Sequence, residues 1–254
     1  MPGGPMEPVG TEASLNALFD RVPAGGGTYE AGTGLPECVE RYFAHAIAPG
    51  ARLANAVRLR MRGEIKLGAW RSFEAEEVIA RGRGMVWTAR TRLFGIPVSG
   101  FDRYIDGRGE MRWKLLGVIP LISQAGPDIS RSAAGRLGGE SMWLPSMLCD
   151  PAVRWEAAGA CEATAHLSLF GDAVAVRLTI GPDGGLRRSS LMRWGNPNGQ
   201  GFAERPFGAC VDAEGRFEGY TIPTEVRAGW EPGATGFGSD GEFFRCTLDA
   251  AIFK

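Results

Sequence analysis

Alternation between apolar and polar residues is the clearest structural signal in this sequence. From Val57 to Leu67 the odd-numbered positions are mainly apolar, and the even-numbered positions are charged. A period of two is typical of a β-strand that buries one face. The same odd-numbered face continues through the segments 85–93, 101–105 and 111–115. Because glycine-containing turns separate these segments, the pattern predicts an antiparallel meander of about four or five strands.

Helical periodicity marks three other parts of the chain. Apolar residues recur at helical spacing over 35–47, and further helical patterns occupy 14–22 and 128–148. Strand patterns resume after the last of these, with Gly, Pro and Asp in the intervening turns. We expect these strands at 153–158, 163–170, 173–180, 186–194, 207–211, 217–221, 225–230 and 242–252.

These elements predict a mainly β fold of the α+β class. The expected architecture is a large curved antiparallel sheet, or incomplete β-barrel, wrapped over one or two helices. The 254 residues fit one large domain, and the 38 glycines favour many short strands joined by tight turns. We expect residues 1–34 to form a flexible N-terminal segment with a short helix. Residues 35–254 are predicted to form a single β-rich half-barrel domain.

The charge and the cysteine content narrow the classes of protein. A formal net charge of -1 provides no basic field, so nucleic acid is not an expected partner. No stretch approaches the roughly 18 apolar residues of a transmembrane helix, and the N-terminus does not resemble an export signal. Five widely spaced cysteines are typical of reduced thiols. These features predict a soluble, cytoplasmic protein, and they do not define its oligomeric state.

Motifs for metal or nucleotide chemistry are missing from the sequence. Its two histidines, His45 and His166, have no cysteine or histidine partner at the spacing of a zinc site. The sequence contains no P-loop, no G-x-S-x-G nucleophile elbow and no G-x-G-x-x-G motif between a strand and a helix. We therefore predict no metal and no cofactor.

Aromatic residues are the candidate walls of an apolar pocket. Trp87 and Trp113 share the inward-facing parity of neighbouring strands, and Phe101 has the same odd parity. Trp143 lies on the helical segment that is expected to cover the sheet. Most tryptophans pack in protein cores, but a subset can line a cavity. We predict that these four residues bind a hydrophobic ligand, with Arg193 near its polar end.

Glu140 is the leading candidate for a polar group inside the fold. A carboxylate on the covering helix is costly to bury without a partner. Two interpretations remain open. Glu140 either forms a salt bridge that holds the helix to the sheet, with Arg103, Arg193 or Arg205 as its partner, or it faces a bound ligand.

His166 and Tyr104 are weaker candidates. His166 shares a strand face with Thr164 and Ser168, opposite a plainly apolar face, so we expect it to point to solvent. A role as general acid or base would need the opposite orientation and a shifted pKa. Tyr104 could line the cavity or lie at its rim. With Glu140, these two residues form the candidate catalytic set if the protein is an enzyme.

Several short motifs resemble an uncharacterised bacterial family of domains of unknown function. They are Leu35-Pro36-x-x-Val39-x-Arg41-Tyr42, Trp70-x-x-Phe73-x-Ala75-x-x-Val78, Met85-Val86-Trp87-x-Ala89-Arg90, Asp102-x-Tyr104, Gly107-x-Gly109, Gly126-Pro127, Glu140-x-x-Trp143-x-Pro145 and Pro223-x-Glu225-Val226. The resemblance extends from Leu35 to Lys254. It implies a fold similar to that of the bacterial lipoprotein carriers, LolA/LolB-like half-barrels around a hydrophobic cavity. Through that fold it implies a protein that binds lipid or another apolar ligand.

The sequence supports three functional hypotheses. The first is a protein that binds a hydrophobic small molecule or lipid in the half-barrel. The second is a cofactor-independent enzyme, an isomerase, dehydratase or hydrolase, which acts on a hydrophobic substrate by acid/base chemistry in the same cavity. A convergent polar pair inside the cavity would favour the enzyme. The third is a structural or interaction protein, which an exposed apolar patch would favour.

Overall fold

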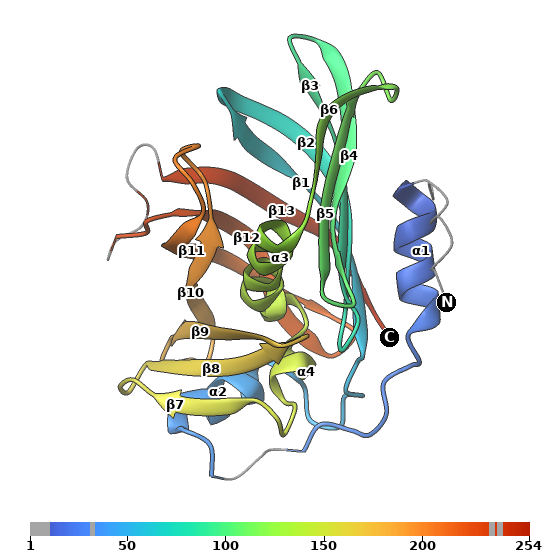
Figure 1. Ribbon diagram of the computed structural model, residues 1–254. Coiled ribbons are helices and arrows are strands. Elements are labelled where there is room, and N and C mark those ends of the chain that lie inside the picture. Colours follow the sequence, from blue (N-terminus) through green and yellow to red (C-terminus); the bar gives the residue numbers. More distant parts are fainter. Residues whose placement is uncertain (1–10, 31–33, 234–236, 238–240) are drawn as a thin grey trace, which may run out of the picture.

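One antiparallel sheet dominates the molecule. The computed structural model describes residues 11–30, 34–233, 237 and 241–254 (Figure 1). Its helices are α1 (Thr11–Arg21), α2 (Glu37–Ala46), α3 (Pro127–Glu140), the 3-10 helix η1 (Ser141–Trp143) and α4 (Pro145–Leu148). Its strands are β1 (Ala56–Leu67), β2 (Ala69–Ala80), β3 (Gly84–Leu93), β4 (Ile96–Ile105), β5 (Arg108–Leu115), β6 (Ile119–Ala125), β7 (Arg154–Ala157), β8 (Glu162–Leu169), β9 (Asp172–Ile180), β10 (Leu186–Gly195), β11 (Ala203–Phe217), β12 (Tyr220–Trp230) and β13 (Glu242–Phe253).

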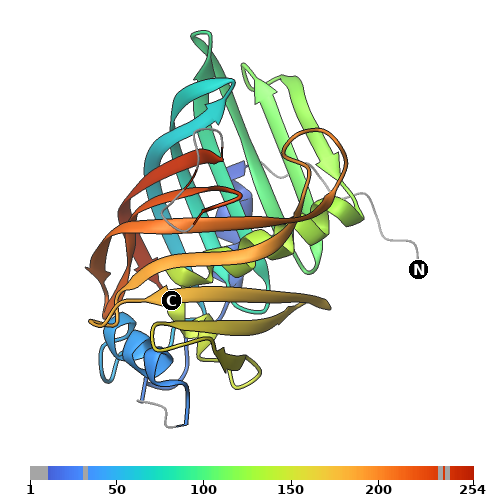
Figure 2. The same cartoon turned by 90° about the vertical axis from the view of Figure 1, so that its left-hand side faces the viewer.

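The sheet has thirteen strands and curves without closing. Their order is β6-β5-β4-β3-β2-β1-β13-β12-β11-β10-β9-β8-β7, so β6 and β7 are the two edge strands. Pairing of β13 with β1 joins the first meander to the second, which follows α3 in the chain. Figures 1 and 2 show the strands bending around α3, which lies on the concave side. This is the mainly β, incomplete barrel that the alternation predicts.

Side-chain parity on β1 explains which face of the sheet is buried. Val57, Leu59 and Met61 are at most 1% exposed and belong to the main core on the concave face. The intervening Arg60 and Arg62 are exposed on the other face. Full burial of a side chain of this size stabilises a fold by about 1.5–3 kcal/mol, so the alternation determines which face turns inward.

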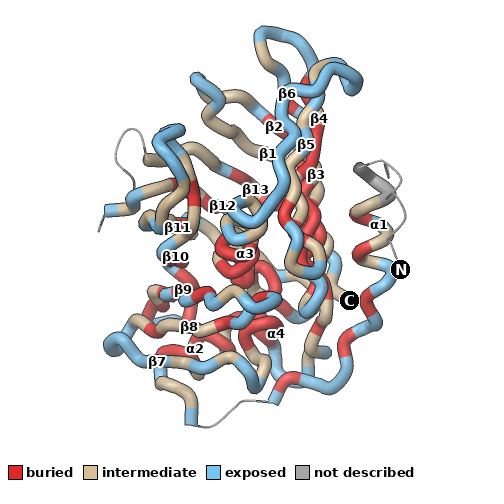
Figure 3. Tube along the Cα trace, in the orientation of Figure 1, coloured by how far each residue is buried: buried red, intermediate tan, exposed pale blue. Residues whose placement is uncertain are grey.

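Small residues let α3 approach the sheet closely. Pro127 begins the helix, where its missing N–H costs nothing. A Cβ added at Gly138 would lie 2.6 Å from Val174 Cγ1 of β9, and one at Gly135 would lie 3.0 Å from Arg193 Cγ of β10. The helix contacts β4, β5 and β6 on one side and β8, β9 and β10 on the other. It therefore fills the middle of the half-barrel, with its buried residues in the main core (Figure 3).

The other two longer helices lie on opposite faces. Buried residues of α2, such as Val39 and Phe43, join the main core against β8, β9 and β12. Leu15 and Leu18 of α1 form a separate cluster with outward-facing residues of β1–β3, including Val78. Both helices match the predicted segments. The five cysteines are all free thiols, as their spacing predicts.

The strand predictions need three corrections. Strands β2 and β6 were not predicted, so the first meander has six strands. The turn expected at 212–215 is absent, because β11 continues through it with bulges near Ala213 and turns at Glu218-Gly219. The inward parity also changes on β4. A two-residue turn pairs Leu93 with Ile96, so odd-numbered residues of β3 lie opposite even-numbered residues of β4. The inward-facing residues of β4 therefore have even numbers.

Five tight turns share one backbone geometry but carry different residues. In each, a residue with φ between 48° and 53° precedes a glycine with φ between 74° and 97°; the pairs are Phe94-Gly95, Asp106-Gly107, Leu116-Gly117, Phe170-Gly171 and Glu218-Gly219. Hairpin turns with two positive φ values favour Asn, Asp or Gly at the first position. The β1–β2, β3–β4 and β5–β6 turns lie together at one end of the sheet, which we call the tip end (Figure 1).

Candidate ligand-binding site

A cavity of about 420 Å³ lies between α3 with η1 and the concave face of the sheet. Strands from both meanders contribute to its lining, from β1, β3, β4, β5 and β6 to β10, β11, β12 and β13. The cavity therefore occupies the space that α3 leaves inside the curve of the sheet. Its volume falls in the usual range for small-molecule sites, about 300–1,000 Å³.

Aromatic side chains form most of the cavity walls. The lining rings belong to Trp87, Trp143, Phe202, Phe207, Trp230, Phe243 and Phe244. The rings of Phe207 and Trp230 meet edge to face with their centroids 5.1 Å apart. Trp143 Nε1 donates a hydrogen bond to the Pro223 carbonyl oxygen at 3.1 Å, which satisfies its polar atom and fixes the ring. Trp87 and Trp143 therefore both line the cavity, as the sequence predicts.

Three carboxyl groups surround the guanidinium of Arg136 on one wall. Arg136 Nε donates to Glu140 Oε1 at 2.5 Å, and Nη1 donates to Asp102 Oδ2 at 2.9 Å. Nη2 lies 3.5 Å from Glu77 Oε1. The guanidinium also lies over the Trp87 ring, 5.0 Å from its centroid. We call Glu77, Asp102, Arg136 and Glu140 the Arg136 cluster; it joins α3 to β2 and β4.

Burial favours the protonated form of one member of this cluster. Glu77 is 0% exposed, and its Cα pairs with that of Trp87 across β2 and β3. Burial, followed by the negative charge of Glu140, raises the pKa of Glu77 well above its ordinary value, although Arg136 opposes the shift. A neutral Glu77 leaves one positive and two negative charges in the Arg136 cluster. The nearby positive charge of Arg193 then brings the local sum to zero.

Arg193 lies beside this cluster and between aromatic rings. Its Nε donates to the Ser132 carbonyl oxygen at 3.1 Å, and its Cζ lies 4.7 Å from the Phe207 ring centroid and 5.4 Å from that of Trp230. Burial, with repulsion from Arg136, lowers the pKa of Arg193 to about 10. Arg193 lines the cavity as predicted.

The salt-bridge partner of Glu140 is Arg136, which differs from the three candidates considered from sequence. Arg193 donates to α3 backbone, Arg103 pairs with Glu110, and Arg205 lies 3.7 Å from Glu231. Arg136 precedes Glu140 by one helical turn, a spacing that favours an ion pair on a single helix. That spacing was the signal available in the sequence. Glu140 also borders the cavity, so the structural and ligand-facing interpretations are compatible.

Several buried polar atoms at the cavity have no hydrogen-bond partner among the described residues. They are Trp87 Nε1, Glu140 Oε2 and Ser189 Oγ. A buried polar atom without a partner typically costs about 1–3 kcal/mol. The first is a donor, the second an acceptor that a protonated Glu77 would engage, and the third a hydroxyl that can act as either. All three atoms are covered in this structure, so a ligand or water reaches them only when neighbouring side chains move. Ser189 was not predicted, because it lies on a strand whose sequence shows no regular alternation.

Two of the predicted wall residues lie elsewhere. Phe101 pairs with Thr88 and lies on the opposite face of β4 from Asp102, with Arg103 stacked on its ring. The parity change at the β3–β4 turn explains this correction. Trp113 faces inward but does not line the cavity. Its Nε1 donates to Asp102 Oδ1 at 2.9 Å, and its ring centroid lies 5.7 Å from that of Trp87. Trp113 therefore packs against two residues that line the cavity.

Tyr104 and His166 do not border the cavity. Tyr104 is completely buried, and its hydroxyl donates to the Leu169 carbonyl oxygen at 3.2 Å; burial raises its pKa to about 12. His166 lies on the outer side of β8, where its Nε2 is 3.2 Å from Glu156 Oε2. Glu140 is therefore not joined by either proposed partner, and the structure offers no acid/base pair of the predicted kind.

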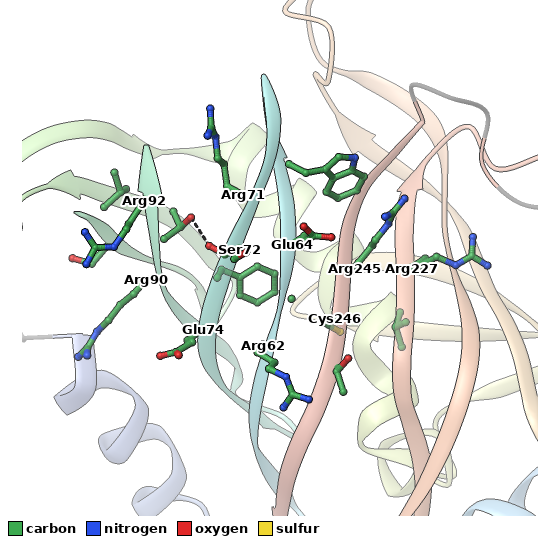
Figure 4. Close-up of a pocket in the computed structure, with 18 of the residues that line it drawn as sticks. Arg62, Glu64, Arg71, Ser72, Glu74, Arg90, Arg92, Arg227, Arg245 and Cys246 are labelled. Atoms are coloured by element: carbon green, nitrogen blue, oxygen red, sulfur yellow. Dashed lines mark hydrogen bonds between the residues drawn. The ribbon is translucent and has the colours of Figure 1, made fainter. Parts of the chain in front are cut away.

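A larger, open hollow of about 1310 Å³ lies against β1, β2, β3, β12 and β13 (Figure 4). Charged side chains from neighbouring strands line it, and several pair with each other. Arg227, for example, donates to both carboxylate oxygens of Asp212, at 2.6 and 2.9 Å. Among the described residues, no three His, Cys, Asp or Glu side chains form a group that could hold a metal ion. The described helices also include none that is long and apolar enough to cross a membrane.

Comparisons with known proteins place the sequence in a family. No curated protein gives a significant match. One similar solved structure is a LolA superfamily protein from Nitrosomonas europaea, with 9% identity, a TM-score of 0.45, and coverage of 88% of this chain and 94% of that chain. Another is a domain from Vibrio parahaemolyticus described as an outer membrane lipoprotein-sorting protein, with 9% identity, a TM-score of 0.37, and coverage of 79% and 86%. Residues 28–237 match a family of unknown function, DUF6544, and the chain belongs to that family.

Proposed function

We propose that the protein binds a hydrophobic small molecule or a lipid in the cavity beneath α3. The observation that carries this proposal is a cavity with aromatic walls whose lining also includes a few polar and charged side chains, among them Glu140, Ser189 and Arg193. Apolar walls supply affinity through burial of ligand surface, and a few fixed polar groups orient one end of the ligand. The cavity has both features within one partly open space.

The charges around the cavity favour a particular type of ligand end. The positive charges of Arg136 and Arg193 balance the negative charges of Asp102 and Glu140 when Glu77 is protonated. A strongly charged ligand would disturb this balance in a site of low polarity. A hydroxyl group, or a carboxyl group bound in its protonated form, can instead exchange hydrogen bonds with Ser189 and Glu140. We therefore infer a ligand with a long apolar part and a hydroxyl or carboxyl end.

The fluorescent fatty acid cis-parinaric acid tests this proposal directly. Its emission rises on transfer to an apolar site, and we expect saturable binding to the full chain. Ala209 of β11 lines the cavity and is buried, so Ala209→Phe places a ring in the ligand space. We expect this substitution to weaken binding at least about tenfold, equivalent to about 1.4 kcal/mol.

Ala213→Phe is the matched control, since Ala213 lies on the same strand and does not line the cavity. It should bind the probe as the wild type does. Circular dichroism and thermal unfolding establish that both variants are folded. Equal binding by wild type and folded Ala209→Phe would show that the cavity is not the binding site, and absence of saturable binding to the wild type would count against the proposal.

A further inference from the structure

The tip end of the sheet gathers most of the exposed apolar side chains of the described chain. Eleven large apolar residues are exposed, and eight of them belong to the segments 65–72, 91–98 and 113–122 around the three turns. We call these three segments the tip patch. Phe94 is 87% exposed and Val118 is 72% exposed. Figure 3 shows this end as largely exposed, in contrast to the buried region around α3.

Contacts between the three turns make the tip patch one surface. The Arg71 guanidinium of β2 lies 5.4 Å from the centroid of the Phe94 ring, which joins the first turn to the second. The Leu116 backbone N–H donates to the Pro97 carbonyl oxygen at 2.9 Å, which joins the third turn to the second. Figures 1 and 2, seen from directions 90° apart, both show the three turns at the same end.

Two apolar residues of the tip patch occupy positions that are unfavourable for folding. Phe94 and Leu116 have positive φ values, where Asn, Asp or Gly would be less strained. At the other end of β4, the equivalent position of the same type of turn holds Asp106. Phe170 also has this backbone geometry, but its ring packs on Tyr104 with a centroid distance of 5.6 Å. Phe94 has little such packing, so folding does not explain its side chain.

The charged residues within the tip patch have one sign. The three segments contain Lys66, Arg71, Arg92 and Lys114 and no Asp or Glu, although the whole chain has a net charge of -1. Figure 4 shows Arg71 and Arg92 on the neighbouring strands β2 and β3. Apolar side chains surrounded by cations are the composition that binds an anionic lipid surface, because the apolar groups enter the acyl region while the cations meet the headgroups.

We propose that the tip patch docks on an anionic membrane surface, with Phe94, Leu116 and Val118 inserted at the boundary between headgroups and acyl chains. Ile65 connects this surface to the cavity, because it lies within the first segment and also lines the cavity wall. A hydrophobic ligand leaving or entering the membrane would thus meet the apolar tips first. The docking surface is tested independently of the cavity proposal, because its inserted residues Phe94, Leu116 and Val118 do not line the cavity and its measurement is different.

Sedimentation with vesicles tests the docking surface. The full chain is mixed with vesicles of phosphatidylcholine and phosphatidylglycerol, and separately with vesicles of phosphatidylcholine alone. We expect stronger binding to the anionic vesicles and weaker binding at high salt, because salt screens the four cations. The double variant Phe94→Asn/Leu116→Asn should weaken binding to anionic vesicles by about tenfold or more, since it removes two inserted apolar groups.

This variant avoids the usual difficulty that a surface substitution fails to fold, because Asn-Gly is the preferred pair for these turns. Met192→Gln is the matched control: Met192 is 56% exposed, as Leu116 is 57%, but it lies on β10 outside the tip patch. It should bind vesicles as the wild type does. The cavity variant Ala209→Phe should also retain vesicle binding, which separates the two proposals.

Three results would overturn the docking proposal. The first is wild-type binding by the folded double variant. The second is the absence of binding to anionic vesicles. The third is self-association in sedimentation velocity that the double variant abolishes while vesicle binding is unchanged, because the patch would then join two copies of this chain. The exposed edge strand β6, which borders the patch, makes that third result a real alternative.

Discussion

The Arg136 cluster and the tip patch depart from ordinary folding preferences in opposite ways. The cluster places charged groups in the interior, where Arg136 is 18% exposed and Glu77 is 1% exposed by side chain. The tip patch places apolar groups in water, with Phe94 at 87% exposure. Local departures from the rules of stable folding often mark functional sites. Here one departure borders the cavity and the other lies at the end of the sheet.

The two regions differ in whether other residues of the chain offset the unfavourable placement of these side chains. Each carboxyl group of the Arg136 cluster lies within 3.5 Å of the Arg136 guanidinium, so folding alone accounts for most of the cluster. In the tip patch, the guanidinium of Arg71 lies over the Phe94 ring, and Val118 is 72% exposed. The comparison indicates that the cluster serves the fold as well as the cavity, whereas the apolar tips require a partner outside the chain.

The largest expected effect comes from removing the central cation. Arg136→Met keeps much of the side-chain volume but leaves the carboxyl groups of Glu77, Asp102 and Glu140 without their shared partner. Breaking a buried ion pair on one side typically costs about 3–5 kcal/mol. Because Arg136 is 18% exposed, we expect the lower end, about 3 kcal/mol, in urea unfolding.

Arg131→Met provides the control on the same helix. Arg131 pairs with Glu204 at 2.5 Å, but its side chain is 50% exposed. An exposed ion pair contributes about 0–1 kcal/mol, and the cation–π contact of Arg131 with the Trp194 ring, 4.1 Å from its centroid, about 0.5–1 kcal/mol. This variant should therefore lose clearly less stability than Arg136→Met. If both substitutions have equally small effects, the Arg136 cluster is not the interior support that the comparison requires.

A smaller effect is expected from Glu77→Gln, and it depends on pH. The raised pKa means that the folded state retains a proton that the unfolded state has lost, so rising pH favours unfolding. The favourable contribution is complete below the ordinary carboxyl pKa, about 4.3, and is lost as pH rises through the raised folded value. Gln cannot ionise, so the variant should gain stability relative to wild type across this range.

Unfolding free energies of wild type and Glu77→Gln, measured in the same buffers, isolate the contribution of Glu77 protonation to stability. Subtraction removes the contributions of other carboxyl groups, such as Asp212, whose pKa a hydrogen bond from Arg227 lowers. A constant difference between wild type and Glu77→Gln at all pH values would mean that folding does not raise the pKa of Glu77.

Much of the fold follows from the sequence because burial depends on local alternation. The inward parity of β1, β3 and β5 and the helical covering segment were sufficient to place Trp87 and Trp143 on the cavity. Phe101 was wrongly predicted to face the cavity because the length of the β3–β4 turn could not be read from the sequence. A two-residue turn exchanges odd for even inward positions, and its length depends on Phe94 adopting a left-handed conformation that its residue type does not favour.

The Arg136 cluster was harder to predict for a different reason. Asp102 lies on the strand whose parity was reversed, and Glu77 lies on a strand where charged residues obscure the alternation. A buried acid contradicts the pattern by which strands are recognised, since its position depends on a cation from a helix nearly sixty residues away in the chain. The ion pair of Arg136 with Glu140, by contrast, could be predicted from the sequence, because the two residues are four positions apart on one helix.

The smallest expected effect concerns the tips, and it reverses the usual sign of a substitution. Phe94→Asn relieves a left-handed residue that costs about 1–2 kcal/mol, while it removes a cation–π contact worth about 0.5–1 kcal/mol at an exposed site. We therefore expect a gain of about 0.5 kcal/mol in the free energy of unfolding. Asp106→Phe makes the opposite exchange at the opposite end. It places a disfavoured residue at a positive φ and removes the ion pair of Asp106 with Arg83, so it should lose stability. If Phe94→Asn instead destabilises the protein, Phe94 contributes to folding, and the difference between the tip patch and the Arg136 cluster disappears.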